Sequence, residues 1–385
     1  MENIARYLNI QLPPKQSAFL WGPRKTGKTT FLRKKFPESV SFNFLETDLF
    51  FEVSKAPSLL RERILGLTSA QLGQPIILDE VQKVPAVMDE VHYLIEEKRL
   101  RFILCGSSAR KLKRGHANLL GGRAWRYEMF PFVSAELPRL DLLRALNNGL
   151  IPSHYLQDDA QMSLRAYLQD YLKEEVASEG LVRNMPAFSR FFDAMSYGHG
   201  EMLNFANIAR DCGVDAKTVR EYYQILVDTL LGRFVEPFKK SQDRGVITRA
   251  AKFYLFDVGV AGCVQRRKIH ELKGDVFGKA FEHFILMEIA AFREYSRKDF
   301  EINYWRTKSG LEVDFVLAKG EVALEVKGAS RIDNSDMRGL RSFTEQYKPK
   351  KAILVSNERE ARLAGDIRIV PWRDFLSALW QGEIL

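Results

Sequence analysis

Apolar and polar stretches follow one another along the first third of the chain in the pattern of strands joined by helices. Short apolar runs predict strands at residues 17–21, 40–45, 75–80, 100–108 and 125–130. Helix-prone sequence lies between most of these runs. Buried runs of this length between helices are typical of central strands in a parallel sheet, whose two faces are both covered. The pattern therefore predicts an α/β fold for this part of the chain.

A phosphate-binding loop follows the first predicted strand directly. Residues 22–29 read G-P-R-K-T-G-K-T, a complete G-x-x-x-x-G-K-[ST] motif between a strand and a helix. Its backbone N–H groups and the helix start attract phosphate oxygens. We expect Lys28 to reach the β- and γ-phosphates of ATP and the hydroxyl of Thr29 to bind Mg²⁺. The expected ATP-binding set is Gly22, Pro23, Arg24, Lys25, Thr26, Gly27, Lys28, Thr29, Thr30 and Ser107.

The strand at residues 75–80 ends in Asp79 and Glu80, which suit the Walker B role. We expect Asp79 to hold Mg²⁺ through water and Glu80 to orient the attacking water. An ordinary strand end capped by acids is the alternative. The strand at residues 100–108 ends in two serines. Ser107 or Ser108 could contact the γ-phosphate or the attacking water, or the pair could cap the next helix.

Arg123, which follows two glycines before the last of these strands, is the candidate for stabilising charge on the γ-phosphate. Such an arginine is supplied in cis or by a neighbouring subunit. A surface arginine without this role is the alternative.

Composition narrows the class of protein. The chain has 385 residues, of which 46% are hydrophobic and 28% charged, so two or three folded domains are expected. Lys and Arg number 58 against 49 Asp and Glu, a net charge of +9 that mildly favours an anionic partner such as nucleic acid. The three cysteines form no C-x-x-C pair. No signal-like start and no apolar run near roughly 18 residues is present, so we expect a cytoplasmic protein without a membrane partner.

These motifs together resemble a known family. Pro23-Arg24, Leu78-Asp79-Glu80-Val81-Gln82-Lys83, Gly106-Ser107-Ser108 and Leu120-Gly121-Gly122-Arg123 with Phe130-Pro131-Phe132 carry the resemblance. They are similar to AAA+-type ATPases of bacteria and archaea that have a C-terminal domain of unknown function, number 4143. The resemblance covers nearly the whole chain and implies an ATP-hydrolysing P-loop core. It also implies an arginine near the γ-phosphate, often supplied between subunits of a homo-oligomer. Gly121 stands where the family is expected to have alanine.

Helix-prone, charged sequence at residues 134–186 predicts a small helical lid or linker, whose aromatic residues we assign to packing. A helix-turn-helix is predicted next, with Ile208, Ala209 and Val219 facing inward, a turn at Gly213 and an N-cap at Asp215. Four positions expected to be exposed on its second helix would be available to DNA. They are Lys217, Thr218, Arg220 and Gln224.

Two predicted strands at residues 233–238 and 252–256 would complete a winged helix. Residues 231–273 contain ten Lys or Arg against four Asp or Glu. DNA binding is the favoured interpretation of this basic region. A winged helix used only for packing or subunit contacts is the alternative.

A nuclease-like domain is predicted at the C-terminal end. A helix beginning at Phe277 precedes three strands at residues 302–306, 312–317 and 321–327, and two later strands lie at 351–356 and 367–370. Glu325 and Lys327 share one strand face, and Asp314 could lie beside them. Two carboxylates and a lysine on one face suit phosphodiester cleavage with Mg²⁺ or Mn²⁺. The arrangement resembles the PD-(D/E)xK nuclease superfamily, whose signature Asp314, Glu325 and Lys327 match, while Glu282 matches its helix glutamate.

The predicted organisation has four parts: residues 1–133 as the P-loop ATPase core, 134–186 as lid or linker, 187–265 as winged helix and 266–385 as nuclease-like domain. The leading hypothesis is an ATP-hydrolysing enzyme that binds DNA through its C-terminal domains and could cleave it. The alternative is an ATP-driven switch that binds a protein partner, with a catalytically silent nuclease-like domain. A kinase or transferase is a weaker third hypothesis, because Asp79-Glu80 favours attack by water.

Overall fold

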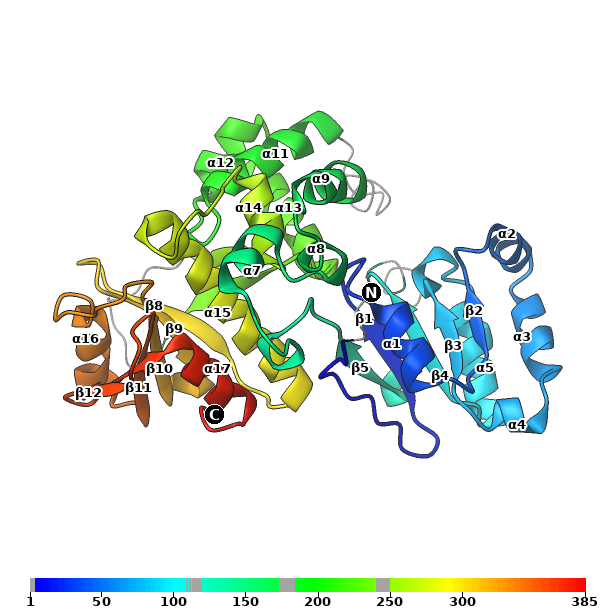
Figure 1. Ribbon diagram of the computed structural model, residues 1–385. Coiled ribbons are helices and arrows are strands. Elements are labelled where there is room, and N and C mark those ends of the chain that lie inside the picture. The colour runs from blue at the N-terminus through cyan, green and yellow to red at the C-terminus, as the bar shows by residue number, and fades with distance from the viewer. Residues whose placement is uncertain (1–3, 109, 111, 113–119, 173–183, 240–249) are drawn as a thin grey trace. The chain divides into compact units, whose positions relative to one another are not determined.

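The computed structural model describes residues 4–108, 110, 112, 120–172, 184–239 and 250–385. The chain forms two compact units, each built around one sheet (Figure 1). The P-loop unit comprises Leu8–Pro131 and Asp228–Leu231. The C-terminal unit comprises Met1–Tyr7, Phe132–Val227 and Gly232–Leu385. Within the described residues, no helix has the length and apolar character needed to cross a membrane.

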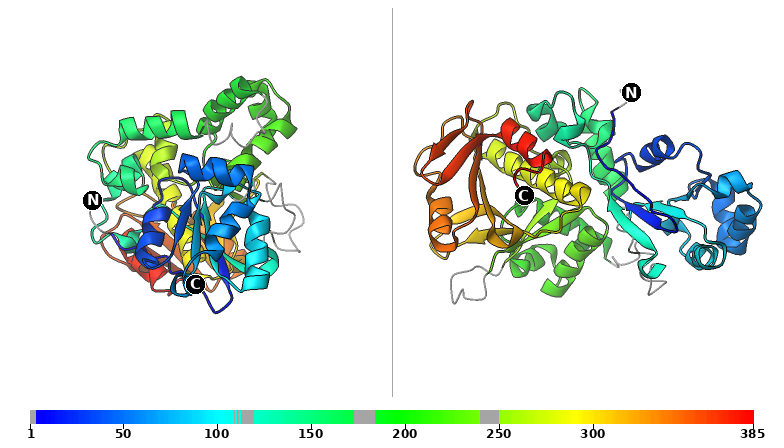
Figure 2. Two further views of the ribbon diagram at one scale, coloured as in Figure 1. Left: turned by 90° about the vertical axis from the view of Figure 1, so that its right-hand side faces the viewer. Right: turned by 90° about the horizontal axis from the view of Figure 1, so that it is seen from below.

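The sheet of the P-loop unit is parallel and has the strand order β2-β3-β4-β1-β5. Its strands are β1 (Ser17–Trp21), β2 (Ser41–Asn43), β3 (Ile76–Asp79), β4 (Phe102–Gly106) and β5 (Ala124–Glu128). Its helices are α1 (Lys28–Lys35), α2 (Thr47–Lys55), α3 (Ser58–Leu65), α4 (Ser69–Leu72) and α5 (Val87–Lys98), which flank the sheet (Figure 2). Every residue of β1, β3 and β4 is buried, as their continuous apolar runs predict. Because β1, β3 and β4 run parallel, their C-terminal ends lie at the same edge of the sheet.

The sheet of the C-terminal unit is mixed and has the order β12-β13-β11-β10-β9-β8-β6-β7. Its strands are β6 (Gly232–Pro237), β7 (Lys252–Leu255), β8 (Ile302–Arg306), β9 (Glu312–Leu317), β10 (Val322–Val326), β11 (Lys351–Ser356), β12 (Arg362–Ala364) and β13 (Ile367–Pro371). The predicted antiparallel meander is present as β8, β9 and β10. The hairpin of β6 and β7, expected as part of a winged helix, extends this sheet because β6 pairs in parallel with β8.

Helices surround this second sheet and form a bundle beside it (Figure 1). They are α7 (Leu142–Asn148), α8 (Pro152–Tyr155), α9 (Gln161–Ala166), the π-helix η4 (Tyr167–Leu172), α11 (Met185–Tyr197), α12 (Phe205–Cys212), α13 (Ala216–Asp228), α14 (Val258–Val264), α15 (Gly274–Ser296), α16 (Arg338–Tyr347) and α17 (Trp372–Trp380). The segment expected as a lid thus belongs to the C-terminal unit and not to the unit that holds the phosphate loop.

The predicted helix-turn-helix is present as α12 and α13. Gly213 ends α12 with φ 67°, a left-handed conformation that glycine adopts readily. Asp215 caps α13 by accepting a hydrogen bond from the N–H of Thr218 at 2.7 Å. Ile208 and Val219 are buried between the helices and their surroundings. The local prediction is therefore confirmed, whereas a role in DNA binding stays a prediction.

The predicted α/β class is confirmed by the parallel sheet of the P-loop unit together with the helices and the second, mixed sheet. The boundaries at residues 133, 186 and 265 stay predictions.

Candidate functional site

The phosphate loop lies between β1 and α1, as its motif requires. Gly22 lies so close to the backbone of Met129 that a Cβ at Gly22 would be 2.4 Å from the Met129 carbonyl oxygen. Lys25 and Gly27 have φ values of 62° and 93°, so the loop curls through the left-handed region. The hydroxyl of Thr26 donates to the carbonyl of Pro23 at 2.8 Å. The backbone is thus folded into a tight loop at the start of α1, a suitable place for phosphate groups.

Lys28 is the first residue of α1 and is 6% exposed. Its Nζ donates to the carbonyl oxygens of Gly22 at 2.7 Å and of Pro23 at 3.0 Å. Both acceptors are neutral groups of the loop itself. The ammonium is therefore held inside the curled loop, where a phosphate oxygen would be a stronger acceptor.

Thr29 and Asp79 lie together at the C-terminal edge of the sheet. The Thr29 hydroxyl donates to Oδ2 of Asp79 at 2.6 Å, and the N–H of Glu80 donates to Oδ1 at 3.0 Å. The two predicted Mg²⁺ ligands are therefore neighbours. Burial, followed by the charge of Asp79, raises the pKa of Cys105 well above its usual range, so this cysteine is a neutral thiol next to the carboxylate.

Glu80 is connected to Ser107 by Gln82, a residue to which the sequence interpretation gave no role of its own. The Gln82 side-chain Nε2 donates to Oε2 of Glu80 at 2.5 Å and to Oγ of Ser107 at 3.0 Å. Gln82 is 5% exposed and lies against Gly106, where a Cβ would be 2.1 Å from its Oε1. The signal in the sequence is a glutamine two residues after the acidic pair together with a glycine at the end of the next strand.

The two serines after β4 have different contacts. Ser107 accepts from Gln82, whereas Oγ of Ser108 accepts from the N–H of Arg110 at 3.1 Å and donates to the carbonyl of Asp228 at 3.4 Å. The capping alternative therefore describes Ser108. Ser107 lies at the end of the sheet where Glu80 lies, so its contact with a nucleotide stays a prediction.

Of the two alternatives for Arg123, supply of this arginine to the γ-phosphate in cis does not fit the register of the sheet. Arg123 directly precedes β5, whose first residue, Ala124, pairs with Ser17 at the start of β1. The phosphate loop follows the other end of β1, where Trp21 pairs with Glu128. At roughly 3.3 Å per residue, Arg123 lies about 17 Å along the strand from that end. Its guanidinium pairs instead with Glu96, so only a role toward a neighbouring copy stays a prediction.

The predicted nuclease-like residues are brought together in the C-terminal unit. Asp314 on β9 and Glu325 on β10 are 7% and 5% exposed, and the N–H of Val326 donates to Oδ2 of Asp314 at 2.8 Å. Nζ of Lys327 lies 2.6 Å from Oε1 of Glu325. Burial and then mutual repulsion raise the pKa of Asp314 well above its usual range, and burial raises that of Glu325 to about 7.

Glu282 on α15 faces the same cluster but is engaged by groups from β7. The hydroxyl of Tyr254 donates to its Oε1 at 2.5 Å, and Nζ of Lys252 lies 3.6 Å from it. The same Nζ lies 2.5 Å from Glu312. Sequence reasoning missed Lys252 and Tyr254, since β7 was assigned to another domain. The available signal was a single lysine at the start of an otherwise apolar strand.

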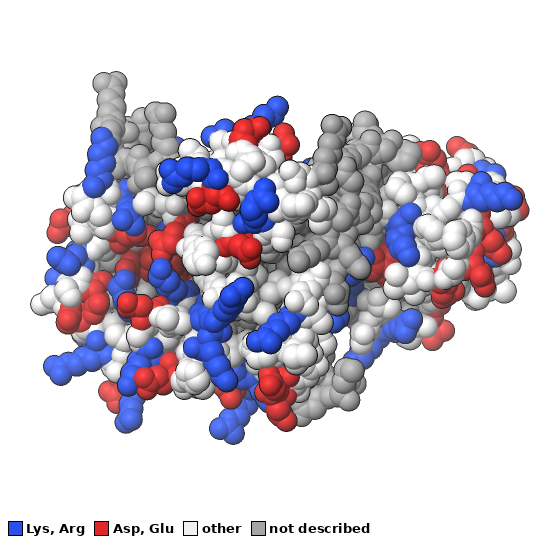
Figure 3. Space-filling view, turned by 90° about the horizontal axis from the view of Figure 1, so that it is seen from above, with Lys and Arg blue, Asp and Glu red and all other residues white. Residues whose placement is uncertain are grey.

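Glu282, Asp314 and Lys327 line a groove of about 590 Å³. Its described lining contains the acids Asp275, Glu282 and Asp314 and the cations Lys273, Lys279, Lys327 and Arg331. On the face shown in Figure 3, acidic and basic side chains are interspersed over the C-terminal unit. The cations of the groove thus exceed its acids by one, and Lys273, Lys279 and Lys327 form ion pairs with Glu271, Glu201 and Glu325.

The two candidate metal sites differ in how well their residues fit an ion. Thr29 and Asp79 offer two oxygens beside the phosphate loop, which suits Mg²⁺ bound together with phosphate. In the part of the chain that the structure describes, no group of three or more His, Cys, Asp or Glu is placed to hold a metal ion. The expected Mg²⁺ or Mn²⁺ at Asp314 and Glu325 is therefore not supported, because Lys327 and the Val326 N–H already engage these carboxylates.

Three family models match successive parts of the chain. Residues 14–137 match an AAA domain, residues 139–271 match "Domain of unknown function (DUF8612)" and residues 277–375 match "Domain of unknown function (DUF4143)".

The chain is also similar to curated and solved proteins. It is 24% identical over 381 residues to the uncharacterized proteins Rv2008c of Mycobacterium tuberculosis and Mb2031c of Mycobacterium bovis, covering 95% of this chain and 82% of each relative. A crystal structure of a Signal Transduction ATPase with Numerous Domains (STAND) protein from Pyrococcus horikoshii is 12% identical, with a TM-score of 0.18. That match covers 77% of this chain and 49% of the STAND protein, and its TM-score is too low to carry an argument. The family matches show that the chain carries an AAA domain of the P-loop ATPase family and, after it, a DUF4143 domain.

Proposed function

We propose that the chain hydrolyses ATP in its P-loop unit and binds DNA through its C-terminal unit. The observation that carries the proposal is the convergence of Thr29, Asp79 and Glu80 at one edge of the parallel sheet, next to the phosphate loop. Ligands of open α/β sheets bind at the carboxyl ends of the strands. The AAA domain match over residues 14–137 supports the same site.

The nucleotide phosphates would lie against the backbone N–H groups of residues 22–29 and the start of α1. Lys28 would exchange the neutral carbonyls of Gly22 and Pro23 for phosphate oxygens, which are better acceptors for an ammonium. Thr29 and Asp79 would hold Mg²⁺, which neutralises charge on the phosphates when bound.

Glu80 would orient the attacking water and accept its proton, the usual task of a positioned carboxylate. Its own carboxylate is oriented by the donation from Gln82, which also binds Ser107. Gln82 is thus a positioning residue that fixes Glu80 relative to the end of β4. Arg123 is proposed to act only on the γ-phosphate bound by a neighbouring copy of the chain. That role requires a homo-oligomer.

Replacing Gln82 by leucine is expected to lower kcat for ATP hydrolysis by roughly ten- to a hundredfold, because a misplaced Glu80 orients water poorly. KM and ADP affinity should change little, since no phosphate contact is assigned to Gln82. Steady-state kinetics with a nucleotide-binding titration would measure both. Gln74→Leu, an exposed glutamine of the same unit, is the matched control. A Gln82→Leu enzyme with normal kcat would rule out the positioning role.

DNA binding is proposed for the groove beside Asp314, where Lys273, Lys279, Lys327 and Arg331 gather. Phosphate oxygens are recognised by such cations, and the binding is weakened by salt. On α13, Lys217, Arg220 and Gln224 are exposed, as predicted, whereas Thr218 is half-buried. Arg220 lies over the ring of Phe205 at 5.0 Å. This helix could add phosphate contacts of its own, as recognition helices do.

The double variant Lys273→Ala/Arg331→Ala is expected to weaken DNA binding about tenfold and to reduce the slope of log K against log salt by about 2. Fluorescence anisotropy with a labelled duplex at several salt concentrations would measure both quantities. Lys308→Ala/Lys348→Ala removes the same charge from exposed positions outside the groove and serves as the control. DNA binding that is absent, or equally weak in both double variants, would refute the proposed groove.

One observation favours a second function, an ATP-driven switch that binds a protein partner and has a silent nuclease-like domain. Glu282 is engaged by Lys252 and Tyr254, and Glu325 by Lys327, while the described residues present no three-ligand metal group. This face therefore supports binding better than cleavage. If the wild-type chain shows no salt-sensitive DNA binding, the protein-binding switch is the favoured function.

A further inference from the structure

A second cavity lies in the helical part of the C-terminal unit, away from the residues given roles above. It has a volume of about 790 Å³. Its lining comes from α9, η4, α11, the end of α14 and the turn that follows α14. The described lining contains four cations, Arg165, Arg266, Arg267 and Lys268, and one acid, Asp193. Cavities of this size hold small molecules. Because cations outnumber acids in this lining, an anionic small molecule is favoured.

Arg267 is fixed in the wall by neutral partners. Its N–H donates to the carbonyl of Gly262 at 2.8 Å, and its guanidinium donates to the carbonyl of Val258 and to Oε1 of Gln265, both at 3.0 Å. A Cβ on Gly262 would lie 3.0 Å from Nη2 of Arg267, so the glycine leaves room for the guanidinium. Burial lowers the pKa of Arg267 to about 10, and it therefore stays charged at neutral pH.

No carboxylate forms an ion pair with Arg267 within the described chain. The same is true of Arg165, Arg266 and Lys268, and these three side chains are exposed. Like charges around one cavity repel one another unless an anion enters. Arg267 itself is half-buried, donates to neutral oxygens, and has its charged form favoured by the charge of Asp257. The repulsion among the exposed cations that line this cavity therefore points to an anionic ligand.

The other lining groups indicate which anion would fit. Phe192 offers an aromatic surface on which a base can stack, and Gln161, Gln169 and Ser189 offer hydrogen-bonding groups. Arginine side chains bind phosphate through two parallel hydrogen bonds. We infer that this cavity binds a phosphate-bearing small molecule of nucleotide size, at a site separate from the phosphate loop. The inference does not depend on the proposed ATPase or on DNA binding.

The test measures the binding of inorganic pyrophosphate and ADP by isothermal titration calorimetry. The full chain with Lys28→Ala removes the main phosphate contact of the P-loop unit, so the remaining binding reports other sites. We expect binding in this background, and roughly tenfold or greater weakening when Arg266→Ala/Lys268→Ala is added. Adding Lys308→Ala/Lys348→Ala instead should leave the affinity unchanged, because these exposed lysines lie outside the cavity.

Three outcomes would overturn the inference. One is the absence of pyrophosphate and ADP binding in the Lys28→Ala chain. The second is an equal loss in the two double variants, which would indicate a general charge effect. The third is a selective loss of DNA binding in Arg266→Ala/Lys268→Ala while pyrophosphate binding persists, which would assign these cations to a DNA surface. Circular dichroism would confirm that both double variants are folded, so every outcome is informative.

Discussion

Replacement of Lys28 by alanine is expected to lower ATP hydrolysis by about a hundredfold or more, comparable to the loss of a preorganised donor to developing charge. The ammonium lies inside the curled loop and now donates to the carbonyls of Gly22 and Pro23. Removing it takes away the cation that we expect to contact the γ-phosphate. Nucleotide affinity should fall as well, because the same charge contacts the ground state. Phosphate release and a fluorescent-nucleotide titration measure the two effects.

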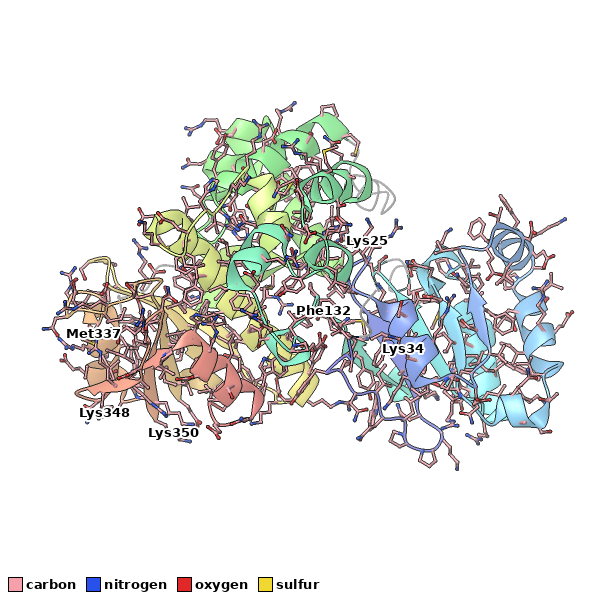
Figure 4. All side chains as sticks on the ribbon, in the orientation of Figure 1. Lys25, Lys34, Phe132, Met337, Lys348 and Lys350 are labelled. Atoms are coloured by element: carbon pink, nitrogen blue, oxygen red, sulfur yellow. The ribbon has the colours of Figure 1, made fainter. Side chains whose placement is uncertain are left out.

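Lys34→Ala is the matched control for this prediction. Lys25 lies in the loop and Lys34 lies further along α1, as Figure 4 shows, and Lys34 is exposed. Its removal changes the net charge equally without touching the loop, so hydrolysis should stay near the wild-type rate. If the two variants lose activity to the same extent, charge or helix stability explains the loss and the assigned role of Lys28 is wrong.

Replacement of Gly259 by alanine is expected to destabilise the C-terminal unit by about 3 kcal/mol or more, because the new methyl group has no space. A Cβ at Gly259 would lie 2.1 Å from the backbone nitrogen of Gly149 and 2.4 Å from the carbonyl carbon of Asn148. Backbone atoms cannot move aside as a flexible side chain can. The carboxylate of Asp257 connects the same two segments, because it accepts hydrogen bonds from the N–H groups of Leu150 and Gly259 at 2.7 and 2.9 Å.

Gly278→Ala gives the opposite expectation and serves as control. Gly278 lies within α15, and no atom lies within 4 Å of a Cβ placed there. Alanine should stabilise this helix by about 0.5–1 kcal/mol, since glycine loses more backbone freedom on folding. Urea unfolding followed by tryptophan fluorescence compares both variants in the same unit. A Gly259→Ala protein as stable as the wild type would show that α7 and α14 are not in this close contact.

Local sequence patterns predicted the P-loop unit well. The strand–loop–helix motif at residues 17–35 and the buried runs of β3 and β4 depend on short-range features, so they could be recognised without knowledge of the fold. The helix-turn-helix was also predicted, because Gly213 and Asp215 determine the helix ends through their own backbone and side-chain chemistry.

Pairing between distant segments could not be predicted in the same way. The parallel contact between β6 and β8 joins residues about seventy positions apart and extends the second sheet across an expected domain boundary. It brings Lys252 and Tyr254 to Glu282, which no spacing rule indicates. Strand β12 was missed because it is short and largely exposed. The choice between cis and trans for Arg123 could not be made from the sequence, because its distance from the loop depends on strand register, which is a property of the folded sheet.

The residues of the two candidate sites that sequence reasoning missed share a physical feature. Gln82 and Lys252 are buried polar groups that act on another side chain and not directly on a ligand. Their types are not diagnostic, since glutamine and lysine are common on surfaces. Only burial and a partner at hydrogen-bonding distance distinguish them, and both appear only in the folded chain.

The most direct test of the central claim is the release of phosphate from ATP in water enriched in oxygen-18, analysed by mass spectrometry. The account predicts Mg²⁺-dependent formation of ADP with phosphate that carries the heavy oxygen, because Glu80 directs water at the γ-phosphate. This product should be lost in Lys28→Ala. ATP that is bound without forming ADP, or ADP formed without labelled phosphate, would contradict the claim and favour a binding protein or a transferase.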